Sequence, residues 1–208
     1  MLVAAVLAGG KSSRFGFGIN KCLYPILGKP MILYIYSKVL KTRFFVDAYA
    51  IVSMNDAEEV HSLGLKVIID NYLAGPLPAV YQALNMFSNV FIVGCDMPLV
   101  DVSSIERMVS MCPDDVDACI PKWGSTGYKE PLFAIYRNSL LGLLEQCFHR
   151  DELSIAKCLD NSSRLANILY IDVNKIFMDP SKELFNLNTP KDLKQFYILL
   201  GDAHDQLY

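Results

Sequence analysis

The chain has 208 residues, of which 52% are hydrophobic and 20% are charged, so it can bury a folded core and is not intrinsically disordered. Its formal net charge of −3 lacks the basic excess of proteins that grip nucleic acid by its phosphates. No run approaches the roughly 20 apolar residues of a membrane helix, and the apolar start has no basic leader or cleavage-type segment. We therefore expect a cytoplasmic protein with no nucleic-acid or membrane partner.

The first half of the chain alternates short apolar runs with longer amphipathic ones. This pattern predicts four buried strands, over Leu2–Leu7, Asp47–Val52, Leu65–Ile69 and Asn89–Gly94. It also predicts four helices, over Pro30–Lys41, Asp56–Leu63, Pro76–Phe87 and Val100–Met111. Asn55 is the expected N-cap of the second helix, and Gly64 is expected to end it.

After Pro113 the pattern is less regular. It predicts strands over Asp117–Ile120, Leu132–Tyr136 and Leu169–Val173, and helices over Asn138–Phe148, Glu152–Leu159 and Thr189–Leu200. The alternation of strands and helices predicts an α/β protein with an open, mostly parallel sheet covered on both faces. One domain over residues 1–208 is the simplest reading, and residues 113–185 are expected to form an acceptor-side subdomain beside the ligand cleft.

The cysteines and histidines show no metal-binding pattern. None of the six cysteines forms a CxxC pair, so we expect reduced, mostly buried thiols, while spacing alone leaves a disulfide between some pair open. The three histidines lie far apart in the sequence. A zinc site is therefore not expected.

The loop after the first predicted strand is suited to phosphate binding. Gly9 and Gly10 let backbone N–H groups approach a phosphate chain without an intervening Cβ. Lys11 and Arg14 add positive charge, and Lys21 follows within reach of the same loop. The loop matches neither GxGxxG nor the Walker A pattern, so it predicts a triphosphate site of another type. The alternative is an ordinary turn with solvated cations.

Two aspartates stand at predicted strand ends, where ligands bind in open α/β sheets. Asp96 follows Gly94 and is itself followed closely by Pro98, which is a suitable place for a Mg²⁺ ligand. Asp70 ends the third strand and is expected to bind ribose or a magnesium-bound water. A helix-capping or turn role is the alternative for both.

Two further segments carry candidate binding groups. Gly75, Pro76 and Leu77 open a predicted helix, whose free N–H groups can face a base or an anion. Asn186 and Asn188 alternate, so they share one side if their segment is extended, and their amides suit a polar heterocycle or a phosphate. Trp123 lies in a polar loop and is suited either to stacking on a planar ligand or to local packing.

Taken in order, these motifs resemble those of the molybdenum cofactor guanylyltransferases. The resemblance rests on Leu7-Ala8-Gly9-Gly10 with Arg14, Gly16 and Lys21, on Gly75-Pro76-Leu77, on Gly94-Cys95-Asp96-Met97-Pro98, and on Asn186-x-Asn188-Thr189-Pro190. It runs from residue 2 to about residue 195. It implies a Rossmann-like, three-layer α/β/α fold of the nucleotidyltransferase type.

The resemblance also implies an activity and a set of roles. The enzyme would transfer GMP from GTP to the phosphate of molybdopterin (molybdenum cofactor), with Mg²⁺ and with release of pyrophosphate. Because this acceptor is labile, transient contact with other cofactor-biosynthesis proteins is expected. Leu7, Ala8, Gly9, Gly10, Ser53, Asp70 and the Gly75–Leu77 segment would bind nucleotide, Lys21 and Arg14 would contact phosphates, Asp96 would bind metal, and Asn186 and Asn188 would lie near the acceptor.

Three alternatives stay open on the sequence. The first is guanylyl transfer to another phosphorylated acceptor, such as adenosylcobinamide phosphate. The second is a cytidylyltransferase, although that branch reads Ala-Ala-Gly where this chain has Ala8-Gly9-Gly10. The third is a non-catalytic nucleotide-binding module, which the presence of both Lys21 and Asp96 disfavours.

Overall fold

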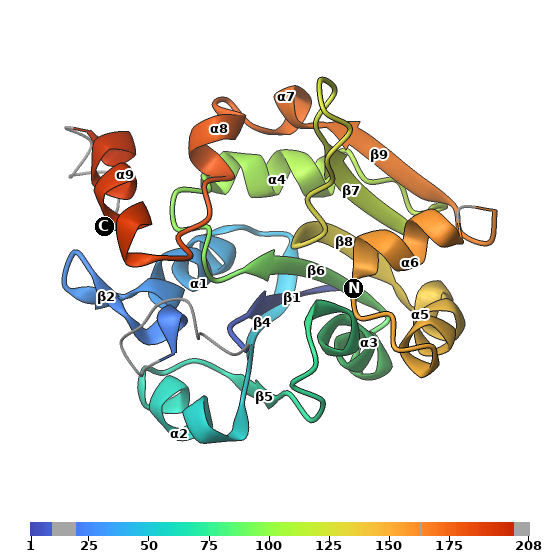
Figure 1. Ribbon diagram of the computed structural model, residues 1–208, viewed down its shortest axis with the longest axis horizontal. Coiled ribbons are helices and arrows are strands. Elements are labelled where there is room, and N and C mark those ends of the chain that lie inside the picture. The colour runs from blue at the N-terminus through green and yellow to red at the C-terminus, as the bar shows by residue number, and fades with distance from the viewer. Residues whose placement is uncertain (10–19, 163, 202–208) are drawn as a thin grey trace.

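A seven-stranded sheet forms the centre of the computed structural model, which describes residues 1–9, 20–162 and 164–201 (Figure 1). The strands lie in the order β5-β4-β1-β6-β8-β7-β9. Their bounds are β1 Leu2–Leu7, β4 Phe45–Val52, β5 Val67–Ile69, β6 Asn89–Gly94, β7 Ala118–Lys122, β8 Phe133–Arg137 and β9 Ile168–Asp172. All the strands that the sequence predicts are present.

The sheet is mostly parallel, as predicted. β1 pairs in parallel with both β4 and β6, and β5 pairs in parallel with β4. β8 alone runs the other way, antiparallel to β6 and β7, while β7 and β9 are parallel. The carboxyl ends of β1, β4, β5 and β6 therefore meet at one edge of the sheet.

Helices cover both faces of the sheet, because its central strands are apolar on both sides. Side chains from α1 (Met31–Lys41), α2 (Met54–Ser62), α4 (Val102–Ser110) and α7 (Val173–Ile176) share one core cluster with the sheet. Side chains from α3 (Pro76–Met86), α5 (Leu141–His149) and α6 (Ile155–Asn161) share the cluster on the opposite face. Along β1, Ala4 and Val6 belong to the first cluster and Ala5 to the second.

A third, smaller core lies beside α1. Here α9 (Pro190–Leu200) packs through Phe196 and Leu200 against Ile26 and Met31. Ile26 belongs to a two-stranded hairpin of β2 (Pro25–Ile26) and β3 (Lys29–Pro30). This packing brings the end of the chain beside its early part, as Figure 1 shows at the left.

Several short elements differ from the sequence-based expectation. The helical turn η1 (Lys21–Leu23), the hairpin β2-β3, α7 and α8 (Pro180–Glu183) were not predicted, because segments of two to four residues show no periodicity. The helix predicted over Asn138–Phe148 begins with a separate helical turn, η2 (Asn138–Leu140), before α5. α2 is capped by Ser53, whose hydroxyl accepts from the N–H of Asp56, and not by Asn55. Thr189 and Asp192 form a capping box at the start of α9.

Residues 113–185 extend the central sheet. β7, β8 and β9 continue it beyond β6, with β8 hydrogen-bonded directly to β6. The main chain of Leu132, just before β8, accepts from the N–H of Gly94 at 2.9 Å. This segment therefore reaches the end of β6, where Asp96 follows.

All six cysteines are paired in disulfides, which corrects the expectation of reduced thiols. The pairs are Cys22–Cys95, Cys112–Cys119 and Cys147–Cys158. The sequence did not reveal them because each pair joins different elements of the fold, and spacing along the chain does not fix the distance between them. Their Cα–Cα distances of 5.8 to 5.9 Å are ordinary for disulfides.

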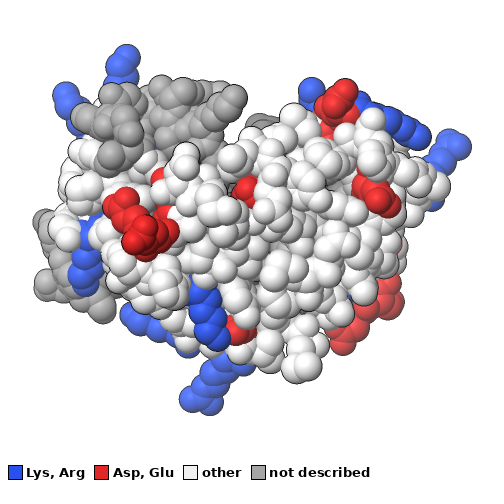
Figure 2. Space-filling view, turned by 90° about the horizontal axis from the view of Figure 1, so that it is seen from below, with Lys and Arg blue, Asp and Glu red and all other residues white. Residues whose placement is uncertain are grey.

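The face in Figure 2 is largely uncharged in its middle. Lysine and arginine side chains of the described residues stand mainly around its border, with acidic side chains between them. Within the described ranges, no helix combines the length and the apolarity that crossing a bilayer requires.

Candidate active site

A cleft of about 190 Å³ lies at the carboxyl edge of the parallel strands. The ends of β1, β5 and β6 and the start of α3 contribute to its walls. Of the residues that the sequence singled out, the cleft is lined by Leu7, Gly9, Lys21, Asp70, Gly75, Pro76 and Asp96. The sequence thus located this edge correctly, since these positions come from four separate segments of the chain.

Lys21 joins two of the predicted polar residues. Its Nζ lies 2.6 Å from Asp96 Oδ2 and 2.7 Å from Asn188 Oδ1. The side chains of Lys21 and Asp96 are 21% and 14% exposed, so the ion pair is partly shielded from water but still open to the cleft. A cation, a carboxylate and an amide from distant parts of the chain therefore meet at one point.

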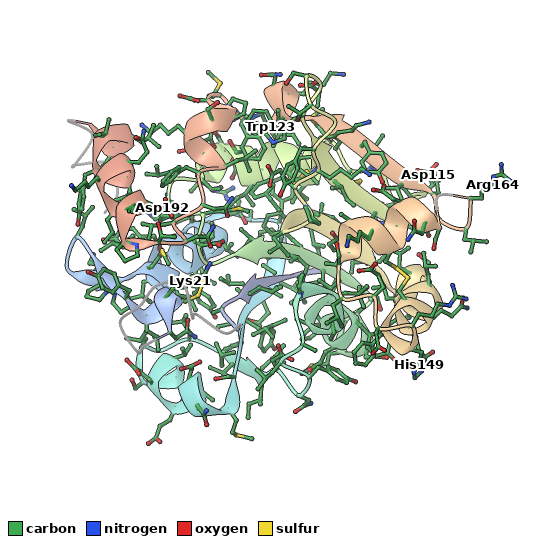
Figure 3. The ribbon with its side chains drawn as sticks, viewed as in Figure 1. Lys21, Asp115, Trp123, His149, Arg164 and Asp192 are labelled. Carbon is green, nitrogen blue, oxygen red and sulfur yellow. A yellow bond between two sulfur atoms is a disulfide. The ribbon has the colours of Figure 1, made fainter. Side chains whose placement is uncertain are left out.

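Asn188 is held in place by the capping box of α9. The carboxylate of Asp192 accepts from the backbone N–H of Asn188 at 2.9 Å and from that of Thr189 at 2.7 Å. One residue earlier, the N–H of Leu187 donates to the main-chain carbonyl of Asp96 at 2.9 Å. In Figure 3, Lys21 and Asp192 lie toward the same end of the molecule, away from His149 and Arg164.

Gly94 leaves room for the Asp96 side chain. A Cβ at position 94 would lie 2.5 Å from Asp96 Oδ1, a distance that real Cβ atoms do not show. Any larger residue there would push the carboxylate out of its place.

Gly94→Ala is therefore expected to lower turnover about tenfold or more, because the Asp96 carboxylate must move, while the unfolding free energy should change little, because a carboxylate at the end of a side chain can shift. The control is Gly142→Ala in α5, where a Cβ would meet nothing within 4 Å and alanine favours the helix. Steady-state kinetics and urea unfolding of both variants test this. Equal turnover in the two would contradict it.

Lys38, on α1, holds the turn that follows Asp96. Its Nζ donates to the carbonyl of Pro98 at 2.7 Å. Burial lowers the pKa of Lys38 to about 8, and the nearby carboxylates of Asp101 and Glu183 only partly oppose this. The folded protein thus gives up this proton at a lower pH than the unfolded chain, whose pKa is near the ordinary 10.5.

This difference predicts a pH dependence of stability. Below about pH 8 both states hold the proton and the burial cost is present in full. From there to about pH 10.5, the unfolded chain binds more protons, so stability rises with pH. Relative to Lys38→Met, the wild type should gain on the order of 2 kcal/mol across this window in urea unfolding. Lys41 is exposed on the same helix, so Lys41→Met should keep the wild-type dependence of unfolding free energy on pH. The same dependence in Lys38→Met would contradict the assignment of the effect to Lys38.

Asp70 shapes the loop on the other side of the cleft. Its Oδ1 accepts from the N–H groups of Tyr72 and Leu73 at 2.9 and 3.0 Å. Leu73 takes a positive φ of 48° and lines the cleft. Asp70 therefore has the turn role that the sequence left open, and it also faces the cleft, where a Cβ on Gly9 would lie 3.4 Å from its Oδ2.

The Gly75–Leu77 segment is divided between the cleft and the core. Gly75 has a φ of 117°, which favours glycine, and it precedes α3 with Pro76 as the first helical residue. Both line the cleft. Leu77 is fully buried among the side chains that pack under the sheet, so its side chain supports the helix and does not face the cleft.

Besides Leu77, four predicted residues in the described ranges do not line the cleft, and one of them, Asn188, is placed beside it by its hydrogen bond with Lys21. Ala8 is buried, and its N–H donates to the carbonyl of Ile51 in the adjacent strand. Ser53 hydrogen-bonds Asp56 at the start of α2. Asn186 donates to the carbonyl of Leu184 at 3.1 Å. Gly10 and Arg14, together with Lys11, lie outside the described residues.

The sequence did not reveal the role of Asn20. Its Nδ2 donates to the carbonyl of Ala8 at 2.8 Å and to Asp56 Oδ2 at 2.9 Å, while its Oδ1 accepts from the N–H of Cys22. One side chain thus ties the end of β1, the start of α2 and η1 together. The sequence signal that could have indicated this role is an asparagine, a common N-cap residue, directly before Lys21.

Glu130 is a further carboxylate near this edge, in addition to Asp70 and Asp96, and the sequence did not single it out. It is 7% exposed and accepts from Trp123 Nε1 at 2.7 Å. Burial raises the pKa of Glu130 and the charge of Asp96 raises it further, whereas the hydrogen bond from Trp123 opposes them. Trp123 (Figure 3) therefore has a local partner and packs against the core.

Comparison with known proteins agrees with this arrangement. Residues 4–165 match the family described as MobA-like NTP transferase domain. A protein of Thermococcus sibiricus named "Probable molybdenum cofactor guanylyltransferase" is 33% identical over 93% of this chain and 96% of its own length. A protein of Pyrococcus furiosus with the same name is 35% identical over 94% of this chain and 96% of its own length.

A solved structure has the same fold. It is the molybdopterin-guanine dinucleotide biosynthesis protein A of Archaeoglobus fulgidus, which superposes with a TM-score of 0.75 at 28% identity, over 94% of this chain and 96% of that one. The ordered motifs, the mostly parallel sheet and the polar cluster at its carboxyl edge agree with these matches. The chain belongs to the MobA-like NTP transferase family and is a nucleotidyltransferase of the group named molybdenum cofactor guanylyltransferases.

Proposed function

We propose that this chain transfers GMP from GTP to the phosphate of molybdopterin and releases pyrophosphate. The observation that carries the proposal is the contact of Lys21 with Asp96, both of which line the cleft, and with Asn188 beside them. The names of the relatives supply the nucleotide and the acceptor class.

The nucleotide would lie along the cleft between β1 and α3. Gly9 lines this space without a side chain, and the first turn of α3, after Gly75, offers the positive end of a helix dipole. Asp70 faces the same space and can accept from a ribose hydroxyl or a base N–H.

The transfer itself needs positioning and charge stabilisation more than covalent help. An oxygen of the acceptor phosphate attacks the α-phosphorus of GTP, and the bond from that phosphorus to the pyrophosphate oxygen breaks. The attacking phosphate is already anionic, so no general base is required. Lys21 would offset the charge that develops on the α-phosphate and on the leaving pyrophosphate.

The residues present fit a magnesium ion held through phosphates. Mg²⁺ commonly binds one or two carboxylates together with phosphate oxygens and waters. Within the described ranges no hydrogen bond reaches Asp96 Oδ1, and no three metal-binding side chains gather into a cluster. Asp96 would hold the ion, which when bound would neutralise negative charge on the phosphates.

The acceptor would approach from the side of the C-terminal segment. Asn188 stands beside Lys21, with its Oδ1 accepting from the Lys21 ammonium, and its amide can contact the acceptor phosphate or pterin. Asn186 lies two residues earlier with its Nδ2 directed to the chain itself, so its role is the less direct of the two.

Calorimetry with GTP, CTP and ATP, with and without Mg²⁺, tests the nucleotide. We expect tight binding of GTP only, strengthened by Mg²⁺. Pyrophosphate release in the presence of molybdopterin then tests the acceptor. A preference for CTP or ATP would contradict the guanylyl assignment, and GTP binding without pyrophosphate release would contradict the acceptor.

A further inference from the structure

A disulfide lies directly beneath the two charged residues of the site. Cys22 follows Lys21, Cys95 precedes Asp96, and the two cysteines are bonded to each other with a Cα–Cα distance of 5.8 Å. They are separated by 73 residues in the chain. The crosslink therefore joins the backbone at Lys21 to the backbone at Asp96.

The disulfide is part of the packed interior. Cys22 and Cys95 are 1% and 2% exposed and belong to the core cluster that α1, α2, α4 and α7 share with the sheet. Cys95 is also fixed to β1 by a hydrogen bond from its N–H to the carbonyl of Leu7 at 3.0 Å. The end of β6 is thus held in place by the sheet, and the disulfide links η1 to it.

The Lys21–Asp96 ion pair restrains η1 against the end of β6 less than the disulfide does. Lysine carries its charge on a flexible four-carbon stem, and partly exposed ion pairs contribute little to holding two backbones together. A disulfide restricts the two Cα atoms that it joins in every state of the chain. Asn20 adds hydrogen bonds on one side of η1, whereas the disulfide acts on the side that faces Asp96.

We propose that the Cys22–Cys95 disulfide is a positioning element of the transfer reaction. It holds η1 at the distance from β6 at which Lys21 and Asp96 meet, so that both charges face the same phosphates. The inference rests on the proposed function, because that function gives the two charges their roles. Of the six cysteines, Cys95 alone lines the cleft among the described residues.

The other disulfides provide a matched control. Cys147–Cys158 joins α5 to α6, is also buried, and lies on the opposite face of the sheet. We compare Cys22→Ala/Cys95→Ala with Cys147→Ala/Cys158→Ala at a temperature where circular dichroism shows both to be folded. Both should lose thermal stability. Only the first should lose kcat, by about 10- to 100-fold at saturating GTP, since small displacements at a reacting centre have effects of this size.

The single variants test whether the crosslink itself is required. Either Cys22→Ala or Cys95→Ala alone breaks the crosslink, so each should lower kcat as much as the double variant does. A double-variant kcat equal to that of the Cys147/Cys158 control, or a single variant that keeps the wild-type kcat, would overturn the proposal.

A measurement without substrate distinguishes failure of this inference from failure of the proposed function. In protein labelled with ¹⁵N lysine, the NMR resonance of the Lys21 ammonium should be protected from exchange with water in the wild type. The resonance is assigned by its loss in Lys21→Met. Cys22→Ala/Cys95→Ala should lose that protection, while the control should keep it. Protection that survives would overturn the inference even if the wild type transferred no GMP. Peptide mapping under non-reducing conditions should show Cys22 bonded to Cys95, and free thiols at both would also overturn it.

Discussion

Replacing Asp96 by asparagine is expected to lower kcat for guanylyl transfer about 1,000-fold, which corresponds to about 4 kcal/mol of lost transition-state stabilisation. Asparagine keeps the size of the side chain but removes the negative charge. Both the ion pair with Lys21 and the proposed Mg²⁺ site depend on that charge.

Single-turnover kinetics at several Mg²⁺ concentrations measure this effect. The variant should require more Mg²⁺ for half-maximal rate, and circular dichroism should show an unchanged fold. Asp47→Asn is a matched control, because Asp47 also pairs with a lysine, Lys66, at 2.6 Å but is remote from the cleft. Full activity of Asp96→Asn would remove the metal assignment.

Lys21→Met is expected to lower kcat about 100- to 1,000-fold, in the range found when one charge-stabilising donor is removed. Methionine keeps most of the aliphatic stem and removes the ammonium. The loss should fall mainly on kcat and less on the KM for GTP, because the charge on the leaving pyrophosphate grows during the reaction.

Steady-state kinetics of Lys21→Met beside Lys66→Met provide the test. Lys66 pairs with Asp47 at the surface, with a side chain that is 60% exposed, so its loss should leave kcat unchanged. A rate unchanged in Lys21→Met would show that the phosphate contact falls elsewhere. Lys11 and Arg14, which lie outside the described residues, would then be the next positions to replace.

The sequence predicted the sheet and the edge at which the cleft lies. Long apolar runs such as Leu2–Leu7 and Asn89–Gly94 gave the strands, since burial on both faces leaves a continuous signal. The residues directly after them, Asp96 above all, followed from the rule that ligands bind at the carboxyl ends of parallel strands. Lys21 was expected within reach of the loop after the first strand, and its contact with Asp96 is an observation that the sequence did not predict.

The rest depends on contacts between residues that are far apart in the chain. No periodicity indicates that β8 runs antiparallel beside β6, or that Leu187 donates to the carbonyl of Asp96. Ser53 stands near a position where the resemblance implies a nucleotide contact, but its hydroxyl caps α2. The disulfides were missed for the same reason, because the pairing of cysteines is a property of the fold and not of their spacing.

The bond between Lys21 and Asn188 spans 167 residues, and it implies an order of events during synthesis. Strands β1, β4, β5 and β6 are complete once residue 94 has been made, so half of the sheet can form on a nascent chain. The polar cluster cannot, because Leu187 and Asn188 are still missing. A growing chain would therefore form the edge proposed to bind the nucleotide long before it has a complete site, and it would become competent only after residue 188 has left the ribosome.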